Sequence, residues 1–186
     1  MHGCARCPAL VRSRSRVVPG DGAIPADIAF IGIAPGRLGG DRSGIPFNGD
    51  RSGELLARMI SAAGLRRVFI TNIVRCNPRD GNGRNRDPDA REIANCRDFL
   101  RAELAHAAPK IVVCLGRLAW RELAGRVASF APLEPAFVNR GGVMLYPMYH
   151  PAYVVRGAYS AREYARDFTR LAGLLARVTT IPDVRR

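Results

Sequence analysis

The chain has 186 residues, 47% of them hydrophobic, which suits one domain with a sizeable core and excludes a disordered protein. No apolar run reaches the roughly 20 residues of a membrane span, and the N-terminus lacks the apolar core of a signal peptide, so we expect a cytoplasmic protein with no membrane partner. The net charge is +13, almost all of the positive charge is arginine, and the composition therefore indicates a polyanionic partner, most simply nucleic acid. A GC-rich genome would also favour arginine over lysine, but it would not explain the excess of arginine over acidic residues.

Strands and helices are predicted to alternate along the chain. Short apolar, β-branched runs predict strands within residues 27–36, 68–74, 110–116 and 141–151. Helical periodicity is found over residues 52–65, 87–107, 117–125 and 161–178, with Ser52 expected to cap the first helix. This alternation predicts an α/β protein: a single three-layer α/β/α domain over residues 1–186, with a mostly parallel central sheet of about four strands. Residues 79–89 are rich in glycine and polar residues and are expected to be flexible.

Each predicted strand is followed by residues that can carry chemistry. The four sequences are "APGRLGGD", "TNIVRC", "CLGR" and "YHPA". Because ligands of such sheets bind beyond the carboxyl ends of the strands, we expect the four loops to meet at one crevice. The first loop, residues 32–56, is dense in glycine but fits neither the P-loop nor the GxGxxG pattern. Phe47 in this loop could hold a planar ring or could simply fill the core.

The chain contains five cysteines. Cys114 lies in an apolar strand-like run and is expected to be a buried small hydrophobic residue. Four others remain: Cys4 and Cys7, which form a CxxC pair, and Cys76 and Cys96. Four thiolates are adequate ligands for a [4Fe–4S] cluster and equally adequate for tetrahedral zinc, so the spacing leaves both metals open.

Taken together, "GIAPG", "PFNGDRSGELL", "TNIVRC" and "HPAYVVR" resemble the uracil-DNA glycosylase superfamily, in its iron–sulfur branches known as families 4 and 5. The resemblance runs in order over nearly the whole chain, from Cys4 to the last predicted helix. It implies a monofunctional DNA glycosylase of base excision repair, which removes uracil, and other deaminated bases, from DNA. It also implies that the four cysteines bind a [4Fe–4S] cluster rather than zinc, and that this cluster ties down the arm formed by residues 1–26.

The resemblance assigns roles to residues that would bind the flipped base. Gly32 and Ala34 would form the wall of the base pocket, and Phe47 would stack on the uracil ring. Asn72 would bind the polar edge of the base, because an amide offers a donor and an acceptor side by side. His150 would approach O2 of the leaving base.

The catalytic carboxylate is the point at which the sequence departs from the family pattern. Family 4 has an acid directly after the first glycine of its motif, where this chain has Ile33, and Ala34 occupies the position of the water-activating Asp in the best-known members. The resemblance to family 5 then assigns catalytic roles to Asp41 and to His150. Asp50 is the alternative, although it could instead cap the helix that follows.

The loop after the last strand is expected to bind DNA. Tyr153, Val154, Val155 and Arg156 would form a wedge that fills the vacated base stack and contacts phosphate. Arg42 in the first loop is a further expected DNA contact. The alternative is that "HP" merely ends a strand and that the two valines belong to the core.

Two other classes of function stay open from the residues alone. A zinc- or cluster-stabilised nucleic-acid-binding module without catalysis would explain the charge and the cysteines, and an iron–sulfur redox or sensor protein would explain the cysteines. A lyase activity needs an amine, and Lys110, the only lysine, begins a predicted core strand. We therefore expect a monofunctional, monomeric enzyme whose partner is DNA that contains uracil or another deaminated base.

Overall fold

The structure is a computed structural model, and it describes residues 3–125, 130, 138–140 and 143–180. The strands are β1 (Asp21–Gly22), β2 (Ile28–Gly32), β3 (Val68–Asn72), β4 (Ile111–Leu115), β5 (Val138–Arg140) and β6 (Val143–Met148). The helices are α1 (Pro8–Ser13), α2 (Gly40–Ser43), α3 (Arg51–Ala62), α4 (Ala90–Ala107), α5 (Arg117–Ala124), α6 (Pro151–Val155) and α7 (Ala161–Thr180). The α/β class predicted from the sequence is confirmed.

The six strands form one sheet in the order β1-β3-β2-β4-β6-β5. The four predicted strands are the parallel centre, β3-β2-β4-β6, and the two additional strands pair antiparallel at the edges. The sequence therefore predicted too few strands, because β1 and β5 have only two and three residues and no alternating pattern. Along the chain, the strands added after β2 lie first on one side of it and then on the other. The carboxyl ends of β2 and β4 are therefore the switch point at which α/β sheets bind ligands.

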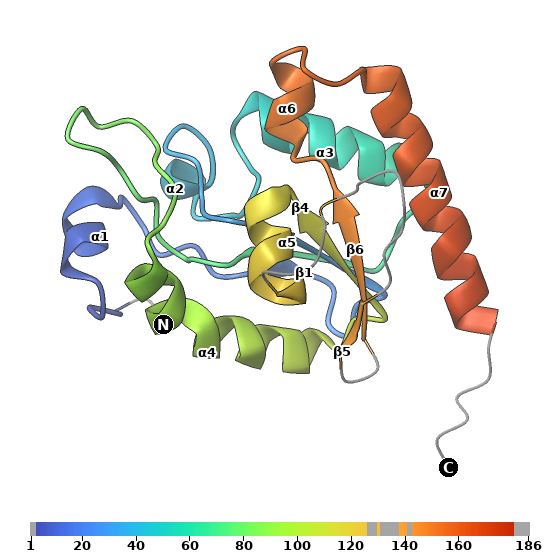
Figure 1. Cartoon of the computed structure of the whole chain (residues 1–186), viewed down its shortest axis with the longest axis horizontal. Coiled ribbons are helices and arrows are strands. Elements are labelled where there is room, and N and C mark those ends of the chain that lie inside the picture. Colours follow the sequence, from blue (N-terminus) through green and yellow to red (C-terminus); the bar gives the residue numbers. More distant parts are fainter. Residues whose placement is uncertain (1–2, 126–129, 131–137, 141–142, 181–186) are drawn as a thin grey trace.

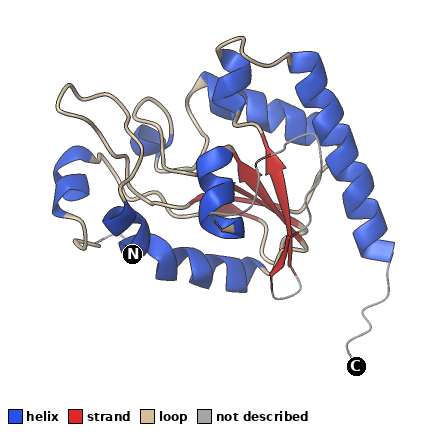
Figure 2. Cartoon of the chain, viewed as in Figure 1, coloured by secondary structure: helices blue, strands red, loops and turns tan. Residues whose placement is uncertain are grey.

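Helices cover both faces of this sheet (Figures 1 and 2). Residues of β2 alternate between the two sides: Ala29 and Ile31 pack with α4 and α5, while Ile28 and Phe30 pack with α3, α6 and α7. The two hydrophobic clusters are therefore separated by the sheet itself, as the three-layer prediction requires. Cys114 belongs to the first cluster and is fully buried, and burial raises the pKa of its thiol.

Side-chain caps determine where two of the predicted helices begin. Asp50, and not Ser52, is the N-cap of α3, since its side chain accepts a hydrogen bond from the backbone N–H of Gly53. Helix α4 begins with a capping box formed by Asp89 and Glu92. Both caps place a carboxylate at the positive end of a helix dipole, where negative charge is favourable.

The N-terminal arm and the loop between β3 and α4 are held against the body of the protein. Leu10 of α1 is fully buried, and the backbone N–H of Val18 donates to the carbonyl of Arg75. The polar stretch expected to be flexible contains an organised turn, in which Asp80 accepts from the backbone N–H groups of Asn82 and Arg84. In the described part of the chain, no helix is long and apolar enough to cross a membrane.

Candidate functional site

A cavity of about 650 Å³ lies at the carboxyl ends of the four parallel strands. Its wall includes residues that follow β2, β3, β4 and β6, among them Ala34, Gly36, Phe47, Asp50, Asn72, Asn85, Gly116, His150 and Arg156. The volume is in the range of sites for small molecules. The convergence of loops expected from the sequence is therefore present, and it brings Ala34, Phe47, Asn72 and His150 together.

Asn72 presents a free amide to this cavity. Asn72 is the last residue of β3 and is 1% exposed. Neither Nδ2 nor Oδ1 of its side chain has a hydrogen-bond partner among the described residues. A buried amide without partners is costly, so native structures rarely keep one without a ligand that completes it. Asn72 thus offers one donor and one acceptor, side by side, to a planar polar ligand.

Gly32, the last residue of β2, allows Asn72 and Phe47 to come close together. A Cβ atom at Gly32 would lie 2.6 Å from Oδ1 of Asn72 and 2.7 Å from Cζ of Phe47. Both distances are shorter than real Cβ contacts, so only glycine is compatible with this arrangement. Gly32 therefore acts on the pocket through its lack of a side chain.

The backbone of Phe47 adopts an uncommon conformation. Its φ angle is +53°, in the left-handed region that non-glycine residues seldom occupy. The backbone of Phe47 packs closely against Gly53 of α3: a Cβ atom at Gly53 would lie only 2.0 Å from the carbonyl oxygen of Phe47. The Phe47 ring is partly exposed, and its centroid lies 5.4 Å from that of His150 with an interplanar angle of 38°. The two rings form adjoining walls of the cavity.

His150 is oriented by the helix that follows it. It is the N-cap of α6, and its Nδ1 accepts a hydrogen bond of 3.1 Å from the backbone N–H of Ala152. Removal from water lowers the pKa of the imidazole to about 4. At neutral pH the ring is therefore neutral, and because Nδ1 accepts, its proton is on Nε2. A Cβ atom at Gly116 would lie 3.3 Å from the Cβ of His150, so the glycine leaves room for the His150 side chain.

Asp41 is in a different position from the one that the sequence led us to expect. The carboxylate is fully buried, accepts two bonds from the backbone N–H of Ser15, and pairs with Arg79 at 2.6 Å. It is not among the residues that line the cavity. Its geometry is that of an ion pair which joins the N-terminal arm to the loop after β3.

Asp50 is the carboxylate that the structure brings to the cavity from the first loop. Its Oδ1 caps α3 at 2.9 Å from the nitrogen of Gly53, and its Oδ2 lies against Gly36 and Gly39. Asp50 is also close enough to His150 for its charge to favour the protonated imidazole, although desolvation outweighs this effect. A single residue therefore serves as a helix cap and as a negative charge at the site.

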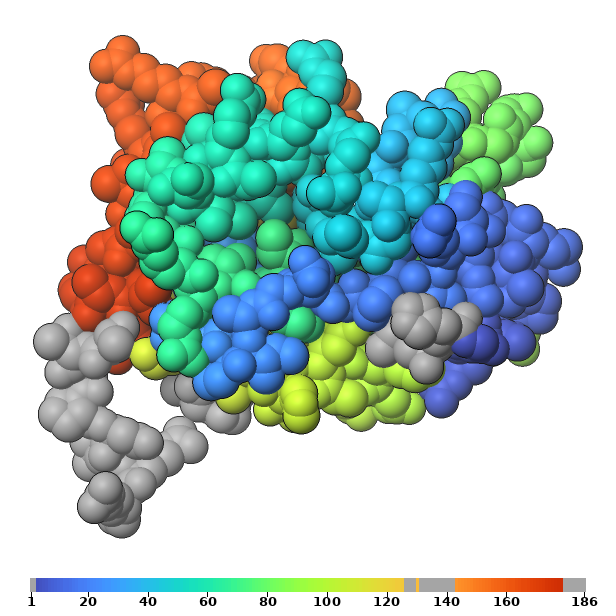
Figure 3. All heavy atoms as spheres, turned by 180° about the vertical axis from the view of Figure 1, so that it is seen from behind, coloured from blue at the N-terminus to red at the C-terminus, as the bar shows by residue number. Residues whose placement is uncertain are grey.

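The loop after β3 contributes cavity residues that sequence reasoning missed. Asn77 is buried, and its amide donates to the carbonyl of Pro35 at 2.7 Å and to Asn85 at 2.9 Å. Asn85 also accepts from the backbone N–H of Arg37. In Figure 3 this loop, in green, stands next to the blue first loop at the same edge of the molecule. Its glycines concealed this order, and the asparagines, which can bond to backbone in loops, were the available signal.

The segment after β6 turns only part of its side chains outward. Val154 is buried and Val155 is partly buried against the core, so the two valines do not form the exposed wedge predicted from the sequence. Tyr153 of α6 and Arg156, the C-cap of this helix, are exposed instead. Tyr153 is 39% exposed and stacks on Tyr149 at 5.1 Å.

Exposed arginines stand near the cavity. Arg156 is exposed and contributes to the cavity wall, and Arg42 is exposed on α2. Neither of these two guanidinium groups takes part in a salt bridge of the described structure. They are available to an anionic ligand.

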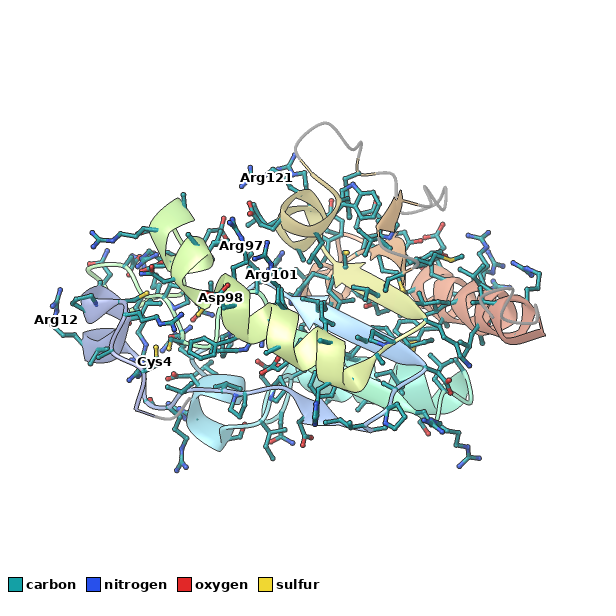
Figure 4. The ribbon with its side chains drawn as sticks, turned by 90° about the horizontal axis from the view of Figure 1, so that it is seen from below. Cys4, Arg12, Arg97, Asp98, Arg101 and Arg121 are labelled. Atoms are coloured by element: carbon teal, nitrogen blue, oxygen red, sulfur yellow. The ribbon has the colours of Figure 1, made fainter. Side chains whose placement is uncertain are left out.

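The four cysteines other than Cys114 lie close to one another, and Cys76 and Cys96 are buried. Cys76 interacts electrostatically with Cys96 and Cys4, and Cys96 with Cys7 and Cys4. Figure 4 shows Cys4 between α1 and the N-terminal part of α4. Burial raises the pKa of the Cys76 and Cys96 thiols, and a bound metal would have to displace their protons. Within the described residues, no three such side chains already stand in a geometry that holds a metal ion.

Comparisons with known proteins point in one direction. Residues 19–171 match the Uracil DNA glycosylase superfamily. A "Type-4 uracil-DNA glycosylase" of Archaeoglobus fulgidus is 36% identical over 92% of this chain and 87% of its own length. A "Type-5 uracil-DNA glycosylase" of Pyrobaculum aerophilum is 37% identical, over 80% of this chain and 78% of its own length. A type-4 enzyme of Thermotoga maritima is 35% identical over 82% and 78%, respectively.

Proposed function

The chain belongs to the uracil-DNA glycosylase superfamily, and we propose that it is a monofunctional glycosylase that hydrolyses the N-glycosidic bond of deoxyuridine in DNA, in base excision repair. The observation that carries this proposal is the unpaired amide of Asn72, buried in a cavity at the carboxyl ends of the strands. A pyrimidine edge that carries a carbonyl beside an N–H supplies the acceptor and the donor that this amide lacks.

Recognition of the base requires that it leaves the DNA stack. Extrusion costs a few kcal/mol, and stacking on an aromatic side chain recovers part of that cost. Phe47 provides this stacking surface, and Asn72 binds the exposed polar edge of the base. Because Asn72 has no protein partner, binding the base costs no existing hydrogen bond in the protein.

His150 acts on the leaving group. As the C1′–N1 bond breaks, its electron pair passes to the base, which develops negative charge at its carbonyl oxygens. The neutral imidazole, held by its cap with Nε2–H available, donates to that oxygen. A preorganised donor of this kind typically contributes about 10²–10³ in rate.

The structure favours Asp50 over Asp41 as the carboxylate of the reaction. The sugar becomes cationic while water adds to C1′, and the proton that the water loses is taken up by the departing base, so a negative charge beside the sugar lowers the barrier. Asp50 lines the cavity, whereas Asp41 is engaged with Arg79 and Ser15 away from it. We therefore move the catalytic role that the resemblance assigned to Asp41 onto Asp50, and we assign Asp41 to joining the arm and the loop.

Exposed side chains around the cavity hold the DNA. Arg156 and Arg42 contact phosphate, and Tyr153, already stacked on Tyr149, fills the space that the extruded base leaves. The charge of +13 makes this binding strong at low salt and weak at high salt, through counterion release.

The four clustered cysteines fit a [4Fe–4S] cluster. The donor set is four thiolates, contributed by the N-terminal arm, the residue after "TNIVR" and α4, and a cluster held by Cys4, Cys7, Cys76 and Cys96 would cross-link these three segments. Its contribution is structural, because the cysteines are not among the residues of the cavity wall.

The distribution of amines supports hydrolysis without a lyase step. Lys110 lies before β4, at the end of the sheet opposite to the cavity, and pairs with Asp27 at 3.0 Å. A Schiff base with the sugar would need that amine inside the cavity.

We further propose that the protein acts as a cytoplasmic monomer. We also propose that Gly36, which lines the cavity, leaves room for weaker action on another deaminated base such as hypoxanthine.

The test is incubation of the purified protein with uracil-containing DNA, followed by alkali to reveal abasic sites. Cleavage that depends on alkali supports a monofunctional glycosylase, whereas binding without cleavage supports a nucleic-acid-binding module. The carboxylates are separated by single-turnover kinetics of Asp50→Asn and Asp41→Asn, since asparagine is as good an N-cap as aspartate. We expect about a 10²-fold loss of rate for Asp50→Asn. Asp41→Asn should mainly lower the thermal midpoint, and a reversed pattern would return the catalytic role to Asp41.

A further inference from the structure

We infer that Arg75 is the positioning residue of the base pocket: its buried side chain fixes the backbone of Asn72, and so the direction in which the Asn72 amide points. The inference rests on the proposed function, in which Asn72 binds the base. Arg75 is 1% exposed and is not among the residues that line the cavity, so it does not contact a base there and acts indirectly.

The peptide group that follows Asn72 is held from both of its sides. Its carbonyl oxygen accepts a hydrogen bond from Nη1 of Arg75, and the same nitrogen donates to the carbonyl of Ile73 at 3.2 Å. Its N–H, which belongs to Ile73, donates to the carbonyl of Gly32 at 2.8 Å. Rotation of this peptide would break bonds on both sides, so the ψ angle of Asn72 has one supported value.

This support matters because the Asn72 side chain has none of its own. Both of its amide atoms lack partners among the described residues, so before the base arrives only the backbone and steric contacts orient the amide. A pocket that must present a donor and an acceptor in fixed places needs a rigid backbone beneath them.

Glu103 on α4 keeps the guanidinium in place. It pairs with Arg75 through Nη2 at 2.5 Å and Nε at 3.2 Å, in the bidentate geometry that arginine favours. The remaining capacity of the carboxylate is used by the hydroxyl of Thr71 and the backbone N–H of Gly20. A buried ion pair of this kind is weak evidence for stability, and a role in holding one conformation explains it better.

Arg75 also connects the pocket to the cysteines. Its backbone carbonyl accepts from the N–H of Val18. Burial raises the pKa of the Cys96 thiol, and the backbone of Arg75 and the charge of its guanidinium both lower it. A side-chain substitution that keeps the positive charge leaves both the backbone contacts and the charge beside Cys96 in place. The role in positioning Asn72 can therefore be tested separately from the role in binding the cysteine cluster.

The test variant is Arg75→Lys. Lysine keeps the charge that pairs with Glu103, but it lacks the planar fork that reaches Glu103 and the Asn72 carbonyl together. We expect about tenfold weaker inhibition by free uracil, the ratio that corresponds to losing one hydrogen bond. Affinity for DNA with a tetrahydrofuran abasic analogue, which has no base for Asn72 to bind, should stay within twofold of the parent, as should the iron content.

The matched control is Arg101→Lys, on the exposed face of α4, two residues before Glu103 (Figure 4). It should leave uracil inhibition unchanged. In the background of Asn72→Ala, Arg75→Lys should have no further effect on uracil inhibition, because the residue it positions is already gone. Unchanged uracil inhibition in Arg75→Lys, equal losses with uracil and the abasic analogue, or additive losses with Asn72→Ala would each overturn the inference.

A second variant covers the case in which Arg75→Lys does not fold. Glu103→Gln does not change residue 75, but it removes the negative charge that pairs with the Arg75 guanidinium. Glu103 lies outside the cavity. The inference predicts the same pattern, with uracil inhibition weakened and abasic-DNA binding retained; unweakened uracil inhibition in this variant would contradict it. If the parent protein does not excise uracil, the proposed function is refuted instead. If the parent is active, the difference in uracil inhibition between the parent and the variants tests Arg75 alone.

Discussion

Replacement of Gly32 by alanine adds one methyl group at the point where Asn72 and Phe47, the two side chains that we propose bind the base, meet. The new Cβ would stand 2.6 Å from Oδ1 of Asn72 and 2.7 Å from the Phe47 ring, against 3.4 Å for ordinary contact. Relief therefore requires a displacement of about 0.7–0.8 Å, shared between the two side chains. Neither yields easily, because Phe47 is held by α3 in an uncommon conformation and Asn72 lies at the end of a central strand.

The expected loss is about 10²-fold in the single-turnover rate on uracil DNA, since a misplacement near 1 Å typically costs that much. The overpacked site should also lower the free energy of unfolding by about 1–3 kcal/mol. Single-turnover kinetics and urea unfolding measure the two effects. Gly81→Ala is the matched control, because a Cβ at Gly81 meets nothing within 4 Å. If Gly32→Ala excises uracil at the parental rate, the contact between Asn72, Phe47 and Gly32 does not shape the site.

Further predictions concern three residues, Cys76, Phe47 and His150. Cys76→Ser should lose both the brown colour that we expect of a [4Fe–4S] protein and its soluble yield, because the binding energy of a cluster is partly folding energy. A colourless, folded and active variant would contradict the proposed cluster. Phe47→Ala should weaken binding of uracil DNA by about 1–3 kcal/mol, the typical contribution of stacking on one base, and unaltered affinity and turnover would make Phe47 a core residue only. The single-turnover rate should stay constant from pH 7 to about 5.5 and fall as the pH approaches the His150 pKa of about 4, since protonation of Nδ1 breaks the cap that orients the ring. An unfolded histidine binds its proton near pH 6.5, so between about pH 4 and 6.5 the unfolded state holds more protons and His150 makes the protein less stable as pH falls; a midpoint of activity near 6.5 would show that the ring is not desolvated.

The sequence by itself determined the central architecture. The runs of β-branched and apolar residues identified the four parallel strands, and alternation with amphipathic helices required their parallel pairing. Because the loops after parallel strands meet at one edge, Phe47, Asn72 and His150 could be expected at one site from their places in the chain. The short edge strands could not be recognised, since two or three residues carry no periodicity.

Which side chains face the site was decided only by the tertiary structure. Asp41 and Asp50 stand in the same glycine-rich loop, and their order in the sequence does not show that an arginine from a distant loop pairs with Asp41. Val154 and Tyr153 are neighbours whose directions diverge because α6 turns one inward and the other outward. The position of Arg75 beneath Asn72 depends on Glu103, a partner 28 residues away on another element. Long-range partners of polar side chains leave no periodic signal in the sequence, because they are fixed by packing and by the burial of charge.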